Sequence, residues 1–290
     1  MSACGVRTGL VLLSLGLLVC VGRSQAADWK ALNEKAENAP LAELKAAAEK
    51  DPASLDALYV LGLGYLGACD EDASRRCFEE IYRRDPKNIG GRWGRAELLR
   101  RGHELDAAEK ELTAIIREAP AYAPAYITLA YLLFDNDEYE RSMRLAQDVL
   151  SLPEDKVDTT NRARAYLVIG GAKGMIAEGG GPLSKLFNGT RVMAYFRKAQ
   201  ALQPESPGVY FGMGSFYALA PSFAGGDKKK GRALLRIAAA ADPCFPDAWA
   251  RLAEVSLALG DVEDYHRYLA KARSLDPRNK LVLKIEEPAQ

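Results

Sequence analysis

The sequence predicts an all-α protein, a right-handed superhelical solenoid of stacked antiparallel helix pairs. The first observation is a period: prolines recur at one constant interval from Pro52 to Pro86, from Pro86 to Pro120 and again from Pro243 to Pro277. The second is that each interval holds two amphipathic helical patterns separated by a short polar turn. A proline closes the second pattern because it lacks an N–H and its ring clashes with the preceding turn. Self-similarity at a period of this length is the signature of a repeat solenoid.

Residues 1–26 are predicted to be a secretory signal peptide. The apolar run 9–22 carries no charge and is shorter than the roughly 20 residues that span a bilayer. An arginine precedes it, and the small residues Ser24 and Ala26 follow it at the spacing of a cleavage site. We therefore expect cleavage after Ala26 and an exported, periplasmic or secreted protein. One alternative is an uncleaved membrane anchor, and another is lipid attachment at Cys20, where the sequence resembles a bacterial lipobox.

Helix pairs are expected along the whole remaining chain. A leading pair at 28–51 caps the array, and the tail at 278–290 starts with the apolar residues of a further capping helix. No stretch after the signal peptide is long and apolar enough to cross a membrane. The period divides residues 53–277 into six units, which are 53–86, 87–120, 121–153, 154–204, 205–243 and 244–277.

The same helix face repeats from unit to unit. In the first unit Leu58, Leu61, Gly62 and Tyr65 follow at spacings of three, one and three residues, which places them on one side of a helix. The second helix carries a small residue, Ser74 in this unit, and a large apolar residue four positions later. The first-helix offsets recur at Tyr126, Leu129, Ala130 and Leu133, at Tyr210, Met213, Gly214 and Tyr217, and at Trp249, Leu252, Ala253 and Ser256.

These matches make the chain resemble a tetratricopeptide-repeat (TPR) array over about residues 53–277. The resemblance implies a concave groove lined by the first helix of each unit. The side chains that it places in the groove are Tyr59, Leu63, Leu66, Trp93, Glu97, Arg100, Ile127, Tyr131, Phe134 and Phe211, followed by Ala250, Glu254 and Leu257. A groove rich in aromatic residues suits an extended peptide or a partner helix. The alternative is that a C-terminal or neighbouring helix fills it.

Two insertions interrupt the period. The fourth unit has 51 residues and the fifth has 39, with the extra chain at 179–189 and 220–227, between the two helices of each unit. Equivalent places in adjacent units lie on the same edge of a solenoid, so we expect a loop edge that presents Phe187, Phe223 and Asp227 to a partner. The alternative is a pair of surface loops whose phenylalanines cap the core.

The fifth unit carries a narrower resemblance. The stretch from Tyr217 to Asp227, together with the lysine-rich helix start after it, is similar to the T-component family of exported repeat proteins, which associate with tripartite (TRAP) transporters. The similar stretch covers about 40 of the 290 residues. It implies an envelope protein that self-associates and meets a solute-binding partner or a small ligand.

Composition argues against an enzyme and against a nucleic-acid partner. The chain has 39 basic and 39 acidic residues and no strongly basic half, whereas neutralising phosphates requires clustered lysine and arginine. Its two histidines, His103 and His266, have no neighbours at metal-ligand spacing, and we interpret both as surface residues. The sequence pattern does not bring together a Ser-His-Asp, Cys-His, paired-carboxylate or metal-ligand group. We therefore expect no catalytic residue, no metal and no cofactor.

Three cysteines remain after cleavage at the predicted site: Cys69, Cys77 and Cys244. An odd number leaves at least one thiol unpaired or bonded to another molecule. We expect all three to pack as small apolar residues. A Cys69–Cys77 disulfide is the alternative, if the fold brings their Cα atoms within about 7 Å.

The function that these observations predict is a non-enzymatic protein–protein interaction scaffold of the bacterial cell envelope. It would bind a protein or peptide in the concave groove and at the loop edge. The alternative is a self-associating, T-component-like accessory of a TRAP-type solute uptake system, which would form a homo-oligomer.

Overall fold

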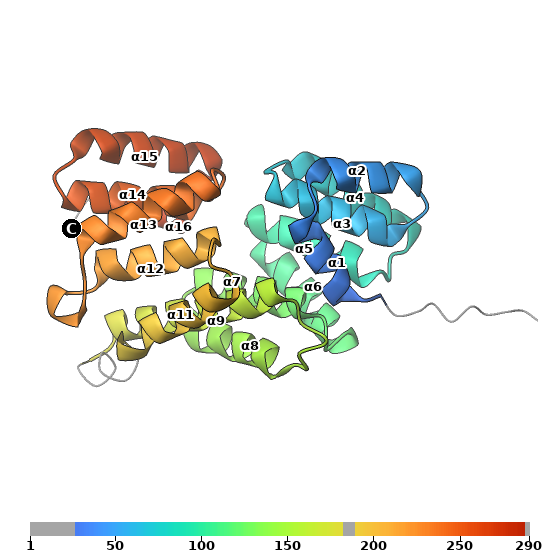
Figure 1. The fold of residues 1–290 in the computed structure, drawn as a ribbon, viewed down its shortest axis with the longest axis horizontal. Coiled ribbons are helices and arrows are strands. Elements are labelled where there is room, and N and C mark those ends of the chain that lie inside the picture. The colour runs from blue at the N-terminus through green and yellow to red at the C-terminus, as the bar shows by residue number, and fades with distance from the viewer. Residues whose placement is uncertain (1–26, 182–188, 288–290) are drawn as a thin grey trace, which may run out of the picture.

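The predicted all-α solenoid of stacked helix pairs is confirmed by the computed structural model, which describes residues 27–181 and 189–287. Within those residues there are α-helices and short 3-10 helices but no strand. Consecutive α-helices from α2 to α16 pack on one another, and α1 packs on α3 (Figure 1). The predicted signal peptide at 1–26 and Phe187 lie outside the described residues, so both stay predictions.

One helix pair lies in each interval of the period. The leading pair is α1 (Trp29–Asn38) and α2 (Leu41–Lys50). The six pairs that follow are α3 (Leu55–Gly67) with α4 (Glu71–Arg84), α5 (Ile89–Arg101) with α6 (Leu105–Glu118), α7 (Ala123–Asp135) with α8 (Tyr139–Ser151), α9 (Thr159–Gly179) with α11 (Val192–Leu202), α12 (Pro207–Leu219) with α13 (Lys228–Ala241), and α14 (Pro246–Ala258) with α15 (Val262–Leu275). A last helix, α16 (Lys280–Glu286), covers α14 and α15, and 3-10 helices η1 (Gly189–Arg191) and η2 (Ser222–Ala224) precede α11 and α13.

Short polar side chains start many of the helices. Ser54 accepts a hydrogen bond from the Ala57 amide at 3.1 Å, and Asp70 accepts one from the Ala73 amide at 2.9 Å. Each such bond satisfies an amide that has no partner inside its helix and stabilises the helix by about 1 kcal/mol. The turn residues of the sequence therefore fix where each helix begins.

A large side chain held between small ones joins neighbouring units. Phe78 of α4 is fully buried, and its ring lies against Gly62 of α3 and Gly94 of α5, where an added Cβ would come within 2.9 Å and 2.1 Å of the ring. Phe196 of α11 lies in the same way against glycines of α9 and α12. Within a unit, the Ser74 hydroxyl donates to the Gly62 carbonyl at 2.9 Å, which holds the two helices close together.

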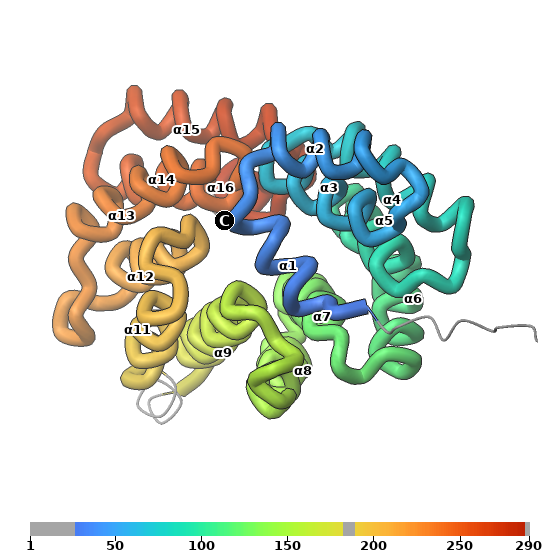
Figure 2. The backbone as a smooth tube through the Cα atoms, turned by 45° about the vertical axis from the view of Figure 1, so that its right-hand side comes forward, coloured from blue at the N-terminus to red at the C-terminus, as the bar shows by residue number. Residues whose placement is uncertain are grey.

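The array curves until its first and last units meet (Figure 2). A disulfide joins Cys69, in the turn between α3 and α4, to Cys244, in the turn before α14, with a Cα–Cα distance of 6.1 Å and a sequence separation of 175. The predicted apolar packing was therefore wrong for Cys69 and Cys244, and so was the alternative Cys69–Cys77 bond, because curvature of the whole array brings together two turns that no local pattern links. Cys77 keeps a free thiol buried on α4, and burial raises its pKa to about 11.

The glycine contacts at Phe78 lead to a stability prediction. Replacing glycine by alanine inside a helix normally stabilises it by up to about 1 kcal/mol. At Gly94 the new methyl group would overlap the Phe78 ring, so we expect Gly94→Ala to lower the free energy of unfolding by about 1–3 kcal/mol. Urea unfolding followed by circular dichroism measures this difference.

Gly67→Ala is the matched control. Gly67 is the last residue of α3, and an added Cβ would meet no atom within 4 Å. We expect this variant to be as stable as the wild type or slightly more stable. Equal losses of stability in both variants would show that the ring contact at Gly94 is not the cause.

Candidate functional site: the concave face and the loop edge

The N-terminal helix α1 lies across the concave face of the array (Figure 2). The Trp29 indole makes edge contacts with the rings of Tyr59 and Tyr122, with centroid distances of 5.3 and 4.9 Å. At the far side of the groove, Lys30 donates to the Glu154 carbonyl at 3.2 Å, in the loop that leads into α9. The helix thus bridges the first helices of units one and three and the start of unit four.

A polar network beneath α1 fixes its position. The Tyr59 hydroxyl donates to the Asn33 side-chain oxygen at 2.8 Å, and the Asn33 amide donates to the Asp158 carboxylate at 3.1 Å. Tyr122 completes the network, because its hydroxyl lies 2.9 Å from that of Tyr59 and is positioned to donate to it. Burial raises the pKa values of both tyrosines, so both stay neutral. Asp158 is itself buried and also accepts from the Asn161 backbone and side-chain amides, at 2.8 and 2.7 Å.

This network predicts that Tyr59→Phe loosens α1. The change leaves the Asn33 oxygen and the Tyr122 hydroxyl without their partner in a buried place, so we expect a loss of about 1–3 kcal/mol in the free energy of unfolding. Amide hydrogen exchange should show faster exchange over residues 29–38.

Tyr122→Phe is the control for this prediction, since it leaves the bond from Tyr59 to Asn33 in place. We expect it to cost less stability and to leave the exchange of α1 close to that of the wild type. The proposed role of the Asn33 bond would be wrong if both variants changed α1 equally.

The predicted groove residues divide into two groups. Tyr59, Trp93, Glu97 and Ile127 are buried, and α1 together with its aromatic neighbours covers the first two. The others are half-buried and reach solvent in part; they are Leu63, Leu66, Arg100, Tyr131, Phe134 and Phe211. At the mouth of the last unit, Ala250 is buried, Glu254 is half-buried and Leu257 is 49% exposed. Over Tyr59 and Trp93 a helix of the chain fills the groove in this structure.

A buried carboxylate lies at the centre of the concave face. Glu97 on α5 accepts hydrogen bonds from Arg100, at 3.0 and 3.1 Å, and from Arg101 at 2.8 Å. Burial opposes its ionisation, but the two guanidinium groups outweigh burial and lower the pKa of Glu97 to about 2. Arg100 also pairs with Asp135 of α7 at 3.6 Å, so the cluster links units two and three.

The low pKa of Glu97 predicts acid sensitivity. Its pKa is lower in the folded chain than the ordinary value of 4.5, so its stabilising contribution is full above pH 4.5 and is lost as the pH falls toward 2. A shift of this size corresponds to a loss on the order of 3 kcal/mol. Denaturant unfolding between neutral pH and pH 3 should show about 2 kcal/mol of this loss, because Glu97 is still mostly ionised in the folded chain at pH 3.

Glu97→Gln removes the titrating group and is the control. We expect this variant to be less stable than the wild type at neutral pH, because Arg100 and Arg101 lose their anion, and to lose less stability on acidification. A variant with the same pH slope as the wild type would exclude Glu97 as the source.

The loop of the fifth unit presents a phenylalanine to solvent. Phe223 is 95% exposed and lies in η2, between α12 and α13. Gly225 is in the left-handed region with φ 92°, and a Cβ on Gly226 would come within 1.7 Å of the Ala220 carbonyl oxygen, so both positions require glycine. Asp227 caps α13 by accepting from the Lys230 amide at 3.0 Å. The glycines and the aspartate therefore build a fixed loop around an exposed aromatic ring.

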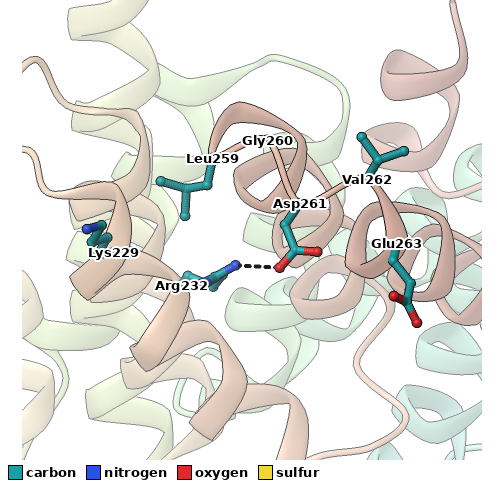
Figure 3. A pocket seen from close by; sticks show the side chains of 7 residues that line it. All are labelled: Lys229, Arg232, Leu259, Gly260, Asp261, Val262 and Glu263. Atoms are coloured by element: carbon teal, nitrogen blue, oxygen red, sulfur yellow. Dashed lines mark hydrogen bonds and ion pairs between the residues drawn. The ribbon is translucent and has the colours of Figure 1, made fainter.

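The same edge continues into the sixth unit. An open hollow of about 460 Å³ lies between the start of α13 and the turn before α15, where Arg232 donates to Asp261 at 3.0 Å (Figure 3). Val262, at the hollow, is 53% exposed. This surface offers apolar and charged groups side by side but no enclosed cavity.

Several residues at the concave face were missed from the sequence. Trp29, Asn33 and Asp158 hold α1 in the groove, although none of them lies at a repeat position. The available signal was Trp29 itself, a large aromatic residue at the start of a helix that was predicted only to cap the array.

No metal centre emerges from the described part of the chain. One group of possible ligands, Cys69, Asp242 and Cys244, has its donor atoms within 4.8 Å of one another, but the disulfide occupies both sulfur atoms. Asp242 accepts from the Cys244 amide at 3.0 Å, as the equivalent Asp276 does from the Arg278 amide at 2.9 Å. The position of Asp242 is thus explained by its hydrogen bond in the repeat and needs no metal.

Among the described residues, no helix combines the length and hydropathy that crossing a membrane requires.

Comparison with known proteins gives matches to solved structures alone, since no protein-family model and no curated protein matches the chain. The protein in an APC/C hetero-tetramer structure of Cut9 and Hcn1 aligns with a TM-score of 0.60 and 15% identity, over 84% of this chain and 44% of that one. A tetratricopeptide repeat protein from Parabacteroides merdae aligns with a TM-score of 0.52 and 18% identity, over 89% and 97%. A monomeric IFIT1 mutant with Gppp-AAAA aligns with a TM-score of 0.56 and 14% identity, over 83% and 56%. At these identities the likeness shows the fold.

Proposed function

From the premise that this chain is a tetratricopeptide-repeat array, we propose that it is a non-enzymatic protein–protein interaction scaffold of the bacterial cell envelope, exported by the signal peptide at 1–26. Stacked repeats form an extended concave surface, and a surface of this kind suits the binding of another protein or a peptide. A protein or peptide would bind at the loop edge and on the part of the concave face that α1 leaves open.

The exposure of Phe223 is the observation that carries this proposal. Leaving a phenylalanine ring in water forgoes roughly 1.5–3 kcal/mol of burial energy, so a rigid loop that holds one outward favours a contact surface. Leu219, at the end of α12, is 43% exposed and adds apolar area beside the loop. Lys230 packs over the Tyr217 ring at 4.0 Å, and the neighbouring lysines add positive charge at the rim. A partner with an apolar anchor and acidic flanks matches this edge.

The open part of the concave face supplies a second contact. Tyr131 and Phe134 are half-buried on α7, and the half-buried Arg100 pairs with Asp135 of the same helix. Burial raises the pKa of Tyr131, so its hydroxyl is a neutral hydrogen-bond donor at physiological pH. An extended segment that enters between α1 and the last units would meet these groups.

The second candidate is a self-associating accessory of a TRAP-type uptake system. The observation that favours it is the loop from Tyr217 to Asp227, which resembles the T-component family and is built around Gly225 and Gly226 as described above. The two candidates differ in mass: the scaffold is expected as a single chain with a protein partner, and the accessory as a homo-oligomer with a bound small molecule. Native mass spectrometry of the protein from its own cells separates them.

The scaffold proposal predicts site-specific crosslinking at the loop edge. We would place a photoreactive phenylalanine analogue at Phe223 in the producing cells and, as a control, at Ile237, which is 45% exposed in the middle of α13. We expect a discrete protein adduct from position 223 and none from position 237, because only the first lies on the proposed contact surface.

Phe223→Ser tests the same contact without a crosslinker. Since the ring is almost fully exposed, the variant should unfold at the same urea concentration as the wild type and should lose the partner that position 223 crosslinks. The loop edge would be excluded as the binding surface if the variant retained that partner at full yield.

A further inference from the structure

Three turn residues share an unusual backbone conformation. Cys69, His103 and Asp137 are spaced by one repeat period, each directly before the residue that caps the second helix of units one, two and three. Their φ angles are 63°, 59° and 64°, in the left-handed region that favours glycine, and the sixth unit has Gly260 with φ 79° in the equivalent turn. Glycine adopts this backbone conformation at a lower conformational energy than Cys, His or Asp. The presence of these three side chains therefore suggests that each one makes a contact that glycine could not make.

Each of the three side chains contacts the C-terminal units. Cys69 is bonded to Cys244, the Nε2 atom of His103 lies 3.0 Å from both carboxylate oxygens of Asp276, and Asp137 pairs with Lys280. We call these six residues the closing edge. They are Cys69, His103 and Asp137 on the N-terminal side and Cys244, Asp276 and Lys280 on the C-terminal side.

Backbone contacts follow the same edge. Arg278 donates to the Gly102 carbonyl at 2.5 Å, and Lys280 donates to the Asp135 carbonyl at 3.0 Å. Arg278 follows Cys244 by one repeat period, as His103 follows Cys69. On the N-terminal side the contact therefore repeats at three successive turns, and on the C-terminal side it lies at the turn before α14 and at residues 276–280.

The two noncovalent contacts of the closing edge differ in exposure, because His103 and Asp276 are partly buried whereas Lys280 and Asp137 face solvent. The Lys280 and Asp137 side chains are 55% and 58% exposed, so salt screens their attraction, and an exposed pair of this kind holds weakly. The disulfide is a covalent bond that salt does not screen. The two kinds of contact thus respond to different conditions.

The buried core of the array is thinnest away from this edge. One large cluster of buried apolar residues runs from α2 to α7, and another from α12 to α16. Between α9, α11 and α12 the buried cluster consists of Ala163, Ala199 and Val209. The Phe196 ring also packs here, between glycines of α9 and α12. We place the bend of the array at this junction, where the chain passes through residues 203–206 into α12, because it has few large buried side chains besides that ring.

We propose that the Cys69–Cys244 disulfide is a redox latch that holds the array closed. With the bond intact, units five and six stay docked on units one to three. With the bond reduced, only hydrogen bonds and ion pairs hold the closing edge, and the last two units move away about the junction between α11 and α12, which widens the concave face. The latch acts whether the scaffold binds at the loop edge or elsewhere, so it stands apart from the proposed function.

The chemical step is a thiol–disulfide exchange with a dithiol. One thiolate of the dithiol attacks a sulfur of the disulfide and forms a mixed disulfide, and its second thiol then closes a disulfide within the reagent. Two electrons and two protons pass to the protein, which leaves Cys69 and Cys244 as thiols. Cys69 is exposed, so a reductant reaches the bond without unfolding the chain.

The test measures the size of the full chain in four conditions. Small-angle X-ray scattering gives the radius of gyration with and without dithiothreitol, at low salt and at about 1 M sodium chloride, where the Debye length falls to roughly 3 Å. We expect a constant radius for the oxidised protein at both salt concentrations. We expect the reduced protein to show a larger radius at high salt, with faster amide exchange at residues 102–104 and 276–278 and unchanged far-UV circular dichroism.

Two sets of variants sharpen this test. Cys69→Ser combined with Cys244→Ser should behave as the reduced protein whether or not dithiothreitol is present, which assigns the effect to this bond. Lys280→Ala should enlarge the reduced protein already at low salt, while Lys229→Ala, an exposed lysine on α13 outside the closing edge, should not.

Two results would overturn the latch. One is a reduced protein at high salt with the radius of the oxidised protein, which would show that the remaining contacts close the array by themselves. The other is a loss of helical circular dichroism on reduction, which would show that the bond maintains the fold rather than the closure. A larger radius with retained helix content supports the proposal.

Discussion

The close approach of helices at glycine and serine positions is the constraint on which the rest of this structure depends. Because Phe78 fits between Gly62 and Gly94, the first helices of consecutive units lie at a fixed spacing on either side of one ring. Phe196 does the same for the fourth and fifth units. Packed interiors change between discrete arrangements and do not deform smoothly, so a fixed spacing at each step sets the curvature of the array. That curvature brings Cys69 to Cys244.

The curvature also determines which part of the concave face is open to a partner. Without α1, a groove lined by Tyr59, Trp93 and Tyr122 would expose a large apolar area. In this chain α1 covers these rings, and its Trp29 packs directly on Tyr59 and Tyr122. A partner that sought the same rings would have to replace both the aromatic contact and the Asn33 hydrogen bonds. A partner that binds at the loop edge would not have to replace any such contact, because the Phe223 ring is 95% exposed. Physical accessibility therefore favours the edge over the covered part of the groove.

Most of the local structure could be predicted from the sequence, and the reason is its period. Proline, the capping residues and the small–large pairs each act within one turn or one unit, so they place the helix pairs and locate the loop around Phe223. The position of α1 could not be predicted in this way, since Asn33 and Asp158 are 125 residues apart and neither lies on the repeat pattern. The disulfide was missed for the same reason: Cys69 and Cys244 meet only because small angles add up over five units. His103 was interpreted as a surface residue, and its contact with Asp276 depends on that same sum.

A linear array has two ends, and each end unit has a neighbour on one side only, which makes the ends the places where unfolding starts. In this chain the end units are neighbours of each other, because the closing edge joins units one and two to unit six, and unit three to α16. The six repeat units then resemble a ring of coupled units, and none of the six can fray without breaking contacts on both sides. Such a chain should melt in one cooperative step while closed, and it should regain the stepwise melting of an open solenoid once its ends are parted.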